Sequence, residues 1–332
     1  MKTCKLLLAA LLAAGTLLPA NAATWRLNPN PDAGADFTSI DEAMADDRVK
    51  EGDELLLDPG TYSGDNKLTK NRLTLTGPGH FLAQDGWSNI DRVIFDNITL
   101  SEGSTIQGCC VKNVLNTNSN SKILRCKIEN IYPQEKVTAS NVLIEGNYVR
   151  NIGSFYLRHL NDCKIRNNII NGIICRADNS TVQYNTFTYA DKTVPIQSLS
   201  YSTITDNVIL GGEIFNRVLN LDTTSNNTIV NNVLSVTADN IDTAYPDNYY
   251  VGATLENTFI DNITGDRYLL RDDSVAKGKA TDGGECGAFG GSHPYVLSGI
   301  PTNMPSITEA KIPSTPTDGK LAITLKIAIQ NE

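Results

Sequence analysis

The chain has 332 residues, enough for one large domain or two small ones. Its formal net charge is −9, and removal of a leader that contains Lys2 and Lys5 leaves 26 basic and 37 acidic residues, a net charge of −11. So acidic a chain is a poor candidate for binding nucleic acid or an anionic membrane surface.

The first 22 residues have the features of a secretory signal peptide. Lys2 and Lys5 precede the apolar run 6–18, and Ala20 and Ala22 fit a small-residue cleavage site. That run is too short for a membrane span, and no later segment has 18 consecutive apolar residues. The sequence therefore predicts an exported protein without a transmembrane segment, in the periplasm, at the cell surface or outside the cell.

Residues 37–62 predict an N-terminal cap. In FTSIDEAMADDRVK (37–50), Ser39 and Glu42 form a capping-box pattern, and the next apolar residues lie on one helical face. Gly52 ends the predicted helix, ELLLD (54–58) indicates a buried strand, and PGTY (59–62) turns the chain.

A repeated pattern, apolar-x-x-Asn-x-apolar, occupies the middle of the chain. It has eight in-register matches at spacings of 17 to 30 residues. Each match is a short alternating run rich in Ile, Val and Thr, then a polar pair, then a second run, which predicts strand, tight turn and strand. A column that keeps its chemistry at variable spacing is typical of a solenoid whose insertions lie in loops. The fourth position of the repeat is occupied by Cys109, Cys126, Asn147, Asn168, Asn185, Asn207, Asn232 and Asn262.

We therefore expect an all-β fold, a right-handed parallel β-helix with an inward-facing asparagine ladder. At a sharp turn the Asn tolerates left-handed backbone geometry, and its amide can bond the equivalent Asn in the next coil. Cys109 and Cys126 replace Asn at the first two steps, where either a disulfide or two stacked free thiols fits. The other cysteines of the exported chain are compatible with disulfides or with free, buried thiols.

After Gly291 the composition changes to a Pro-rich extended tail. KLAITLKIAIQ (320–330) alternates apolar residues with smaller or polar ones and indicates one half-buried terminal strand. We expect this strand to pack along the flank of the solenoid, with pairing to another copy of the chain as the alternative. The predicted organisation is a signal peptide (1–22), a β-helix domain with its cap (23–292) and a tail (293–332).

Two segments and the ladder resemble the pectate-lyase-like superfamily of secreted right-handed β-helix proteins. DFTSIDEAMADDRVKEGDELLLDPGTY (36–62) is similar to the cap, first strand and turn of that family, and YLLRDDSVAKGKATDGGECGAFGG (268–291) to the closing segment of bacterial members. The tail from PYVLSGIP (294–301) resembles exported proteins of gut Bacteroidetes. The resemblance implies polysaccharide as the ligand class, but the paired Asp, His-Gly and Arg-x-Pro-x-x-Arg motifs of the family's hydrolases and lyases have no counterpart here.

Candidate site residues are expected on the outward face of the strand before each variable loop. Anchoring the interior on Val137, Leu157, Cys175 and Ile196 turns their neighbours outward. The expected catalytic group is Lys136, Arg158, His159 and Arg176, and the expected substrate-binding group is Tyr156, Gln197, Asn216 and Arg217.

Arginines in adjacent coils suit an acidic polysaccharide, because Arg pairs bidentately with carboxylates and Tyr stacks on sugar rings. In a β-elimination, Arg158 and Arg176 would neutralise the carboxylate of a uronate, and Lys136 or His159 would remove the C5 proton. The alternative is a solvated surface in which these cations pair with acids such as Glu135 or Asp178. At the level of function, the alternative to a lyase is a non-catalytic glycan-binding or adhesive surface protein.

No cofactor or metal is identified by the sequence. Four acids in the last coils could supply Ca²⁺ ligands, but they lack the spacing of a metal-binding loop, and solvated loop acids are the simpler interpretation. They are Asp222, Asp239, Asp242 and Asp247.

Overall fold

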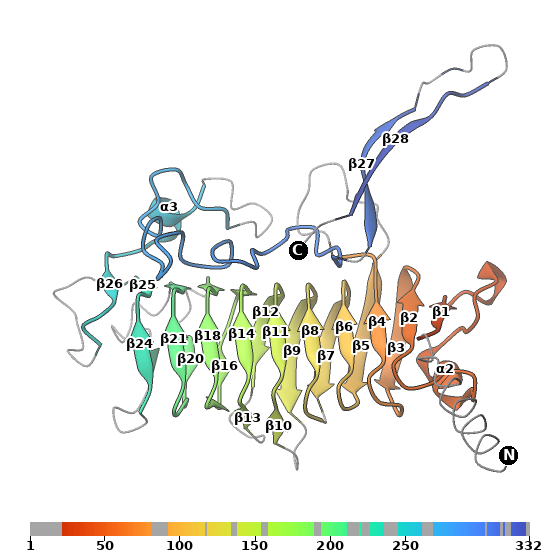
Figure 1. Ribbon diagram of the computed structural model, residues 1–332, viewed down its shortest axis with the longest axis horizontal. Helices are drawn as coiled ribbons and strands as arrows, with labels where there is room; N and C mark the ends of the chain where they lie inside the picture. Colours follow the sequence, from red (N-terminus) through yellow and green to blue (C-terminus); the bar gives the residue numbers. More distant parts are fainter. Residues whose placement is uncertain are drawn as a thin grey trace, which may run out of the picture.

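The protein is a right-handed parallel β-helix, as predicted, with short strands stacked coil on coil into an elongated solenoid (Figure 1). The computed structural model describes residues 22–80, 92–116, 118–133, 138–153, 159–188, 194–210, 219–220, 226–235, 245–260, 268–302, 304–312, 315 and 320–329. The predicted signal peptide lies outside these ranges, apart from its last residue.

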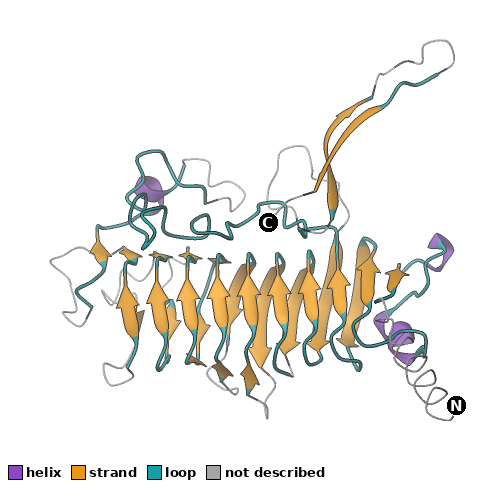
Figure 2. Ribbon diagram, viewed as in Figure 1, coloured by secondary structure: helices purple, strands orange, loops and turns teal. Residues whose placement is uncertain are grey.

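Parallel pairing between successive coils builds three sheets (Figure 2). Sheet A contains β1 (Thr24–Leu27), β2 (Glu54–Leu57), β4 (Thr74–Thr76), β6 (Thr105–Gln107), β8 (Lys122–Leu124), β11 (Leu143–Glu145), β14 (Lys164–Arg166), β18 (Thr181–Gln183), β21 (Thr203–Thr205) and β24 (Thr228–Val230). Sheet C is short and contains β10 (Ala139–Ser140), β13 (Leu160–Asn161) and β17 (Ala177–Asp178).

Sheet B has the most strands of the three. Its main path contains β3 (Gly60–Lys67), β5 (Val93–Leu100), β7 (Cys110–Asn116), β9 (Lys127–Pro133), β12 (Tyr148–Ile152), β15 (Ile169–Ile170), β19 (Thr186–Phe187), β22 (Val208–Ile209), β25 (Val233–Leu234) and β26 (Tyr249–Tyr250). Three further strands join it beside this path: β16 (Ile174–Cys175), β20 (Ile196–Gln197) and β23 (Leu219–Asn220).

The predicted asparagine ladder is present at the turn between sheets A and B. The Oδ1 atom of Asn168 accepts hydrogen bonds from the backbone N and the Nδ2 of Asn147, at 2.9 and 3.0 Å. Its own Nδ2 donates to Oδ1 of Asn185 at 2.9 Å and to the Ile144 carbonyl at 2.9 Å. Every ladder Asn from Asn147 to Asn232 is fully buried, so the column satisfies backbone groups that water cannot reach.

Three details of the ladder differ from the sequence-based expectation. The left-handed backbone falls on the residue before each ladder Asn, for example Asn167 with φ of 53°, while the Asn itself is not left-handed. The rung after Asn232 is Asn248, whose Oδ1 accepts from Asn232 Nδ2 at 2.8 Å. The segment from Phe259 does not form another coil, because Phe259 makes an antiparallel bridge with Leu270; Asn262 lies outside the described residues.

The six cysteines after residue 22 are free thiols, which decides between the alternatives left open by the sequence. Cys126 keeps the ladder continuous through its backbone N–H, which donates to Asn147 Oδ1 at 2.9 Å. The thiols of Cys109 and Cys126 donate to the carbonyls of Gln107 and Leu124 at 3.3 and 3.2 Å.

The N-terminal end is closed by the predicted cap, in a shorter form. Helix α2 (Ile40–Ala45) begins after Ser39, whose hydroxyl accepts from the Glu42 backbone N–H at 3.1 Å. The Glu42 carboxylate binds the Thr38 N–H and hydroxyl, not the Ser39 N–H of a complete capping box. A 3₁₀ helix (Pro31–Ala33) precedes it, and α3 (Leu255–Thr258) lies near the opposite end (Figure 1).

After the last coil the chain turns back and runs along the solenoid as a strap, residues 268–302 (Figure 1). Thr281 bonds Asp206, the Ala288 N–H donates to Thr186 Oγ1 at 2.9 Å, and Asn167 Nδ2 donates to the Gly290 carbonyl at 2.8 Å. These partners belong to successively earlier coils, so the strap crosses the left-handed turns one after another. It continues to Ile300, past the predicted boundary at residue 292.

The tail ends in a hairpin and does not pack on the flank as expected. Strand β27 (Pro305–Lys311) pairs antiparallel with β28 (Thr324–Ile329), and the two project away from the solenoid (Figure 1). The terminal strand predicted from the alternating pattern therefore pairs with another strand of the tail. Several of its apolar side chains remain exposed: Ile312, Leu321, Ile323, Leu325 and Ile327.

Candidate functional site

The strap covers only part of the outward face of sheet B. In the coils nearer the C-terminus, the outward position directly after the ladder holds apolar residues such as Ile169, Val208 and Val233. These side chains form a second hydrophobic cluster with Ala280 and Ala288 of the strap. Gly287 has φ of +92°, and a Cβ there would lie 2.6 Å from Thr186 Oγ1, so this close approach requires glycine.

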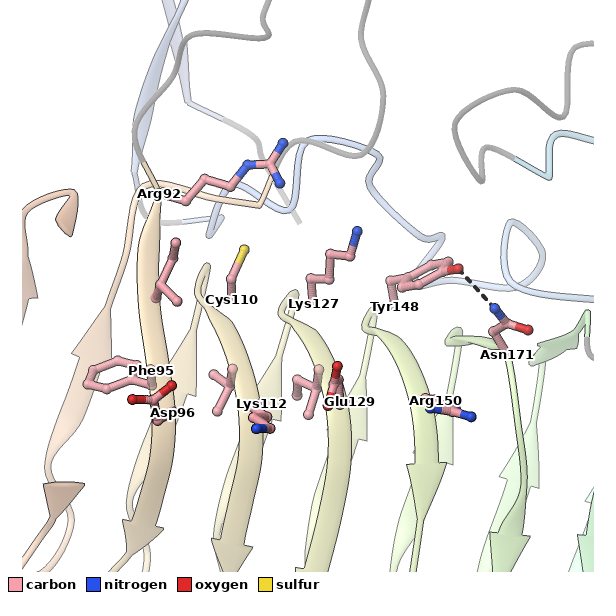
Figure 3. Close-up of a pocket in the computed structure, with 13 residues that line it drawn as sticks. Arg92, Phe95, Asp96, Cys110, Lys112, Lys127, Glu129, Tyr148, Arg150 and Asn171 are labelled. Atoms are coloured by element: carbon pink, nitrogen blue, oxygen red, sulfur yellow. Dashed lines mark hydrogen bonds between the residues drawn. The ribbon is translucent and has the colours of Figure 1, made fainter. Parts of the chain in front are cut away.

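In the earlier coils the same face carries charged side chains among apolar ones and forms a groove of about 490 Å³ (Figure 3). The strap passes beside it, held where Arg125 Nη1 donates to the Ile300 carbonyl at 2.9 Å. Strands β5, β7, β9 and β12 supply the floor, so four successive coils contribute to one elongated site.

Strand alternation arranges the groove side chains in two rows (Figure 3). The upper row comes directly after the ladder position and contains Ile94, Cys110, Lys127 and Tyr148, which the strand register aligns coil by coil. Arg92 extends over this row from the residue before β5. The lower row lies two residues further along each strand and contains Asp96, Lys112, Glu129 and Arg150, all exposed.

Charge on the groove is positive, with four cations and two carboxylates on a chain whose net charge is −9. None of the ion pairs within the described part of the chain joins two members of the lower row. Lys112, Glu129 and Arg150 are exposed and can be reached by a ligand, while Asp96 Oδ2 accepts a hydrogen bond from the Gly64 N–H at 3.2 Å. In the upper row, the Lys127 ammonium lies 5.4 Å from the Tyr148 ring centre, and Asn171 Nδ2 lies 3.4 Å from the Tyr148 hydroxyl.

Cys110 is the thiol of the groove. Burial raises its pKa, while the nearby Arg92 and Lys127 charges act in the opposite direction, and the Arg92 side chain hydrogen-bonds the thiol. The raised pKa keeps Cys110 a neutral thiol, which makes it part of the apolar lining and a poor nucleophile.

His80 connects the strap to this end of the molecule. It is fully buried, its backbone N–H donates to the Ser298 carbonyl at 3.0 Å, and its Nε2 lies 3.4 Å from the Tyr295 hydroxyl. Burial lowers its pKa to about 3, and the charges of Lys127 and Arg92 act in the same direction. His80 is therefore neutral at ordinary pH and holds the strap through packing.

Three of the residues predicted from the sequence are described, and they do not form the expected column. Sheet register pairs Ile174 with Ile196 and Cys175 with Gln197, one residue away from the predicted alignment. Ile174, expected to face outward, is fully buried, and Gln197 is only 8% exposed. Arg176 occupies a turn with φ of 54°, so Arg176 and Gln197 do not lie side by side on one face.

His159 pairs with Asp178, the acid named in the surface alternative. This pair joins β17 to the start of β13 on sheet C, away from the groove. The other predicted site residues lie outside the described part of the chain, and their roles stay predictions: Lys136, Tyr156, Arg158, Asn216 and Arg217.

No group of three or more His, Cys, Asp or Glu side chains in the described ranges is arranged to hold a metal ion. Asp222, Asp239 and Asp242 lie outside those ranges, while the backbone carbonyl of Asp247 accepts from the Asn231 N–H at 2.8 Å.

The groove was missed although the sequence contains a signal for it. Lys127 and Tyr148 stand one residue after the ladder positions 126 and 147, and Lys112, Glu129 and Arg150 stand three residues after positions 109, 126 and 147. Reading the columns just after the ladder, instead of the strand before the variable loop, would have identified it.

Comparison with protein-family models gives no match, and comparison with curated proteins gives none either. In the described residues, no helix is both long enough and apolar enough to cross a membrane. Function must therefore be argued from the groove itself.

Proposed function

We propose that this is an exported β-helix protein of pectate-lyase-like type that binds an acidic polysaccharide along the outward face of sheet B. The observation that carries the proposal is the open groove over four coils, with Arg92, Lys112, Lys127 and Arg150 on its surface. Its straight, elongated floor suits an extended polymer better than a compact small molecule.

The chemistry of the groove matches that ligand. Guanidinium groups of Arg92 and Arg150 can each bind a carboxylate or sulfate through two hydrogen bonds, and the ammonium groups add point charges. Asp96 and Glu129 can accept hydrogen bonds from sugar hydroxyls. The aliphatic stems and the exposed Ile94 offer apolar contact to the faces of sugar rings.

Eliminative cleavage is the catalytic form of this proposal. The neutralising cations would then be those of the groove, and Lys127 or the Tyr148 hydroxyl would exchange the proton. A non-catalytic glycan-binding protein is the alternative, and a specific observation favours it. The described groove lining contains no histidine, and its two carboxylates stand two coils apart, about 9.6 Å at the usual strand spacing.

The test is binding of polyuronates and glycosaminoglycans by affinity electrophoresis, for wild type and Lys112→Ala/Lys127→Ala. The matched control is Lys122→Ala/Lys164→Ala, which removes the same charges from exposed positions on sheet A. We expect the groove variant alone to lose at least tenfold in affinity. Equal loss in both variants, or no binding by wild type, would overturn the proposal. Ultraviolet absorbance of an unsaturated uronate product separates a lyase from a binding protein.

We also propose that the hairpin β27–β28 mediates self-association. An isolated two-stranded hairpin is marginally stable in water, and this one leaves several large aliphatic side chains exposed on β28 and the adjoining segments. Contact with the same hairpin of a second copy would bury them.

A further inference from the structure

The cation of each coil lies alternately on the upper and the lower side of the groove. On the coil of β5 the cation is Arg92 at the upper side and the acid is Asp96 at the lower side. On the coil of β7 the cation is Lys112, at the lower side. The arrangement then repeats: β9 has Lys127 above and Glu129 below, and β12 has Arg150 below with the uncharged Tyr148 above.

The spacing of this alternation is set by the fold. Adjacent coils are about 4.8 Å apart, so cations on the same side recur about every 9.6 Å, and cations on opposite sides are offset by one coil. One sugar ring of an extended chain has roughly the length of one coil spacing. A polymer lying along the axis therefore places successive rings over successive coils.

Ring geometry decides which polymer satisfies every cation. When both glycosidic bonds of each ring are equatorial, the chain is a flat ribbon in which successive rings are turned over, so their carboxylates project from alternate edges. When both bonds are axial, successive carboxylates can still alternate, but the chain is buckled and its rings stand across the chain axis, so it cannot lie flat between the two rows.

The acids of the lower row would enforce this choice. A ring over the coil of β9 can present its carboxylate to Lys127 only if its other edge presents hydroxyls to Glu129. A carboxylate on the lower edge at that coil would face Glu129 and be repelled. Discrimination by such repulsion is a common route to specificity.

We propose that the groove selects an extended, ribbon-like polyanion that carries one carboxylate per ring on alternate edges. This inference rests on the proposed polysaccharide-binding function and specifies its ligand class. Lys112, Lys127 and Arg150 are the residues that fix the register of the chain, and Glu129 rejects a carboxylate in the wrong register.

The experiment compares two homopolymers of equal length and equal charge per ring at one ionic strength. Poly-β-1,4-mannuronate has equatorial linkages, and poly-α-1,4-guluronate has axial ones. We expect the mannuronate oligomer to bind at least tenfold more tightly by isothermal titration calorimetry. Glu129→Gln should reduce this ratio at least threefold by improving the guluronate affinity, whereas Asp47→Asn, an exposed acid beside the cap helix, should leave it unchanged.

The outcomes separate the two proposals. Equal affinity for both polymers, with binding still lost in Lys112→Ala/Lys127→Ala, would overturn the ribbon selectivity and retain polysaccharide binding. Tighter binding of guluronate, or an unchanged ratio in Glu129→Gln, would also overturn the selectivity. Failure of wild type to bind either of these polymers or any other polyanion would overturn both proposals.

Discussion

Lys127 and Tyr148, on adjacent coils of sheet B, face each other in the groove, with the ammonium 5.4 Å from the ring centre. The ring is 8% exposed, so it positions the lysine more than it offers a surface to a ligand. An exposed cation–π contact is worth about 0.5–1 kcal/mol. The contact with the Tyr148 ring therefore favours one orientation of the Lys127 ammonium, the central cation of the groove.

Replacing the Tyr148 ring should weaken ligand binding through Lys127. We expect Tyr148→Leu to lower affinity for an acidic polysaccharide by about two- to fivefold, the equivalent of the lost cation–π contact. Tyr148→Phe keeps the ring and should stay within twofold of wild type. Calorimetric titration of both variants measures this, and an equal loss in Tyr148→Phe would assign the effect to the hydroxyl.

Interrupting the ladder should destabilise the solenoid. Asn168→Ala leaves the Asn147 N–H and the Ile144 carbonyl without their partners in a fully buried turn. We expect a loss of about 2–6 kcal/mol in the free energy of unfolding, since each of the two unsatisfied buried groups costs about 1–3 kcal/mol. Chemical denaturation measures it. Lys164→Ala, an exposed change on the same coil, should stay within about 0.5 kcal/mol.

His80 should make the protein acid-sensitive. Its folded pKa of about 3 lies below its ordinary value of 6.5, so the unfolded chain binds more protons between these values. Stability is therefore complete above about pH 6.5 and falls as the pH drops toward 3. The expected loss attributable to His80 is about 3 kcal/mol between pH 6.5 and pH 4, at about 1.4 kcal/mol per pH unit.

The measurement is the unfolding free energy of wild type and His80→Gln at both pH values. Carboxylates titrate in both proteins, so the difference between the two pH dependences reports His80 alone. Parallel curves would show that His80 is already accessible to protons in the folded protein.

The hairpin should drive association that depends on protein concentration. Leu325 and Ile327 are 46% and 64% exposed and lie on one face of β28. We expect wild type to shift toward dimer with increasing concentration in sedimentation velocity, and Leu325→Lys/Ile327→Lys to remain monomeric. Thr324→Lys adds charge to the opposite face and should behave as wild type; a monomeric wild type at every concentration would contradict the idea.

Features that depend on interactions local in the sequence could be predicted, and features that depend on distant contacts could not. The ladder was predictable because each coil repeats the same local requirement, an amide at one buried turn. Asn248 was missed because its coil begins with Tyr245 and Pro246, where most of the other coils begin with Ile or Val. The predicted alignment of the Arg176 strand with its neighbour is wrong by one residue, because the variable loops between these strands differ in length. In a strand, an error of one residue exchanges the two faces.

The columns that line the groove can be read from the sequence, but which coils stay open cannot, because that depends on contacts between distant parts of the chain. Which stretch of sheet B stays open is decided by the path of the strap, through bonds such as that from Arg125 to Ile300, 175 residues apart. No periodicity in the repeat region records where the strap lies.

The strap also fixes the length of the solenoid. Its contacts with Asn167, Thr186 and Asp206 occur in step with the coils, so an added coil would displace all later partners by about one strand spacing. In most repeat proteins each unit contacts only its neighbours, so the number of units is not tied to a distant segment. In this protein the strap contacts several coils at fixed intervals, so insertion or deletion of a coil would require a compensating change in residues 268–302.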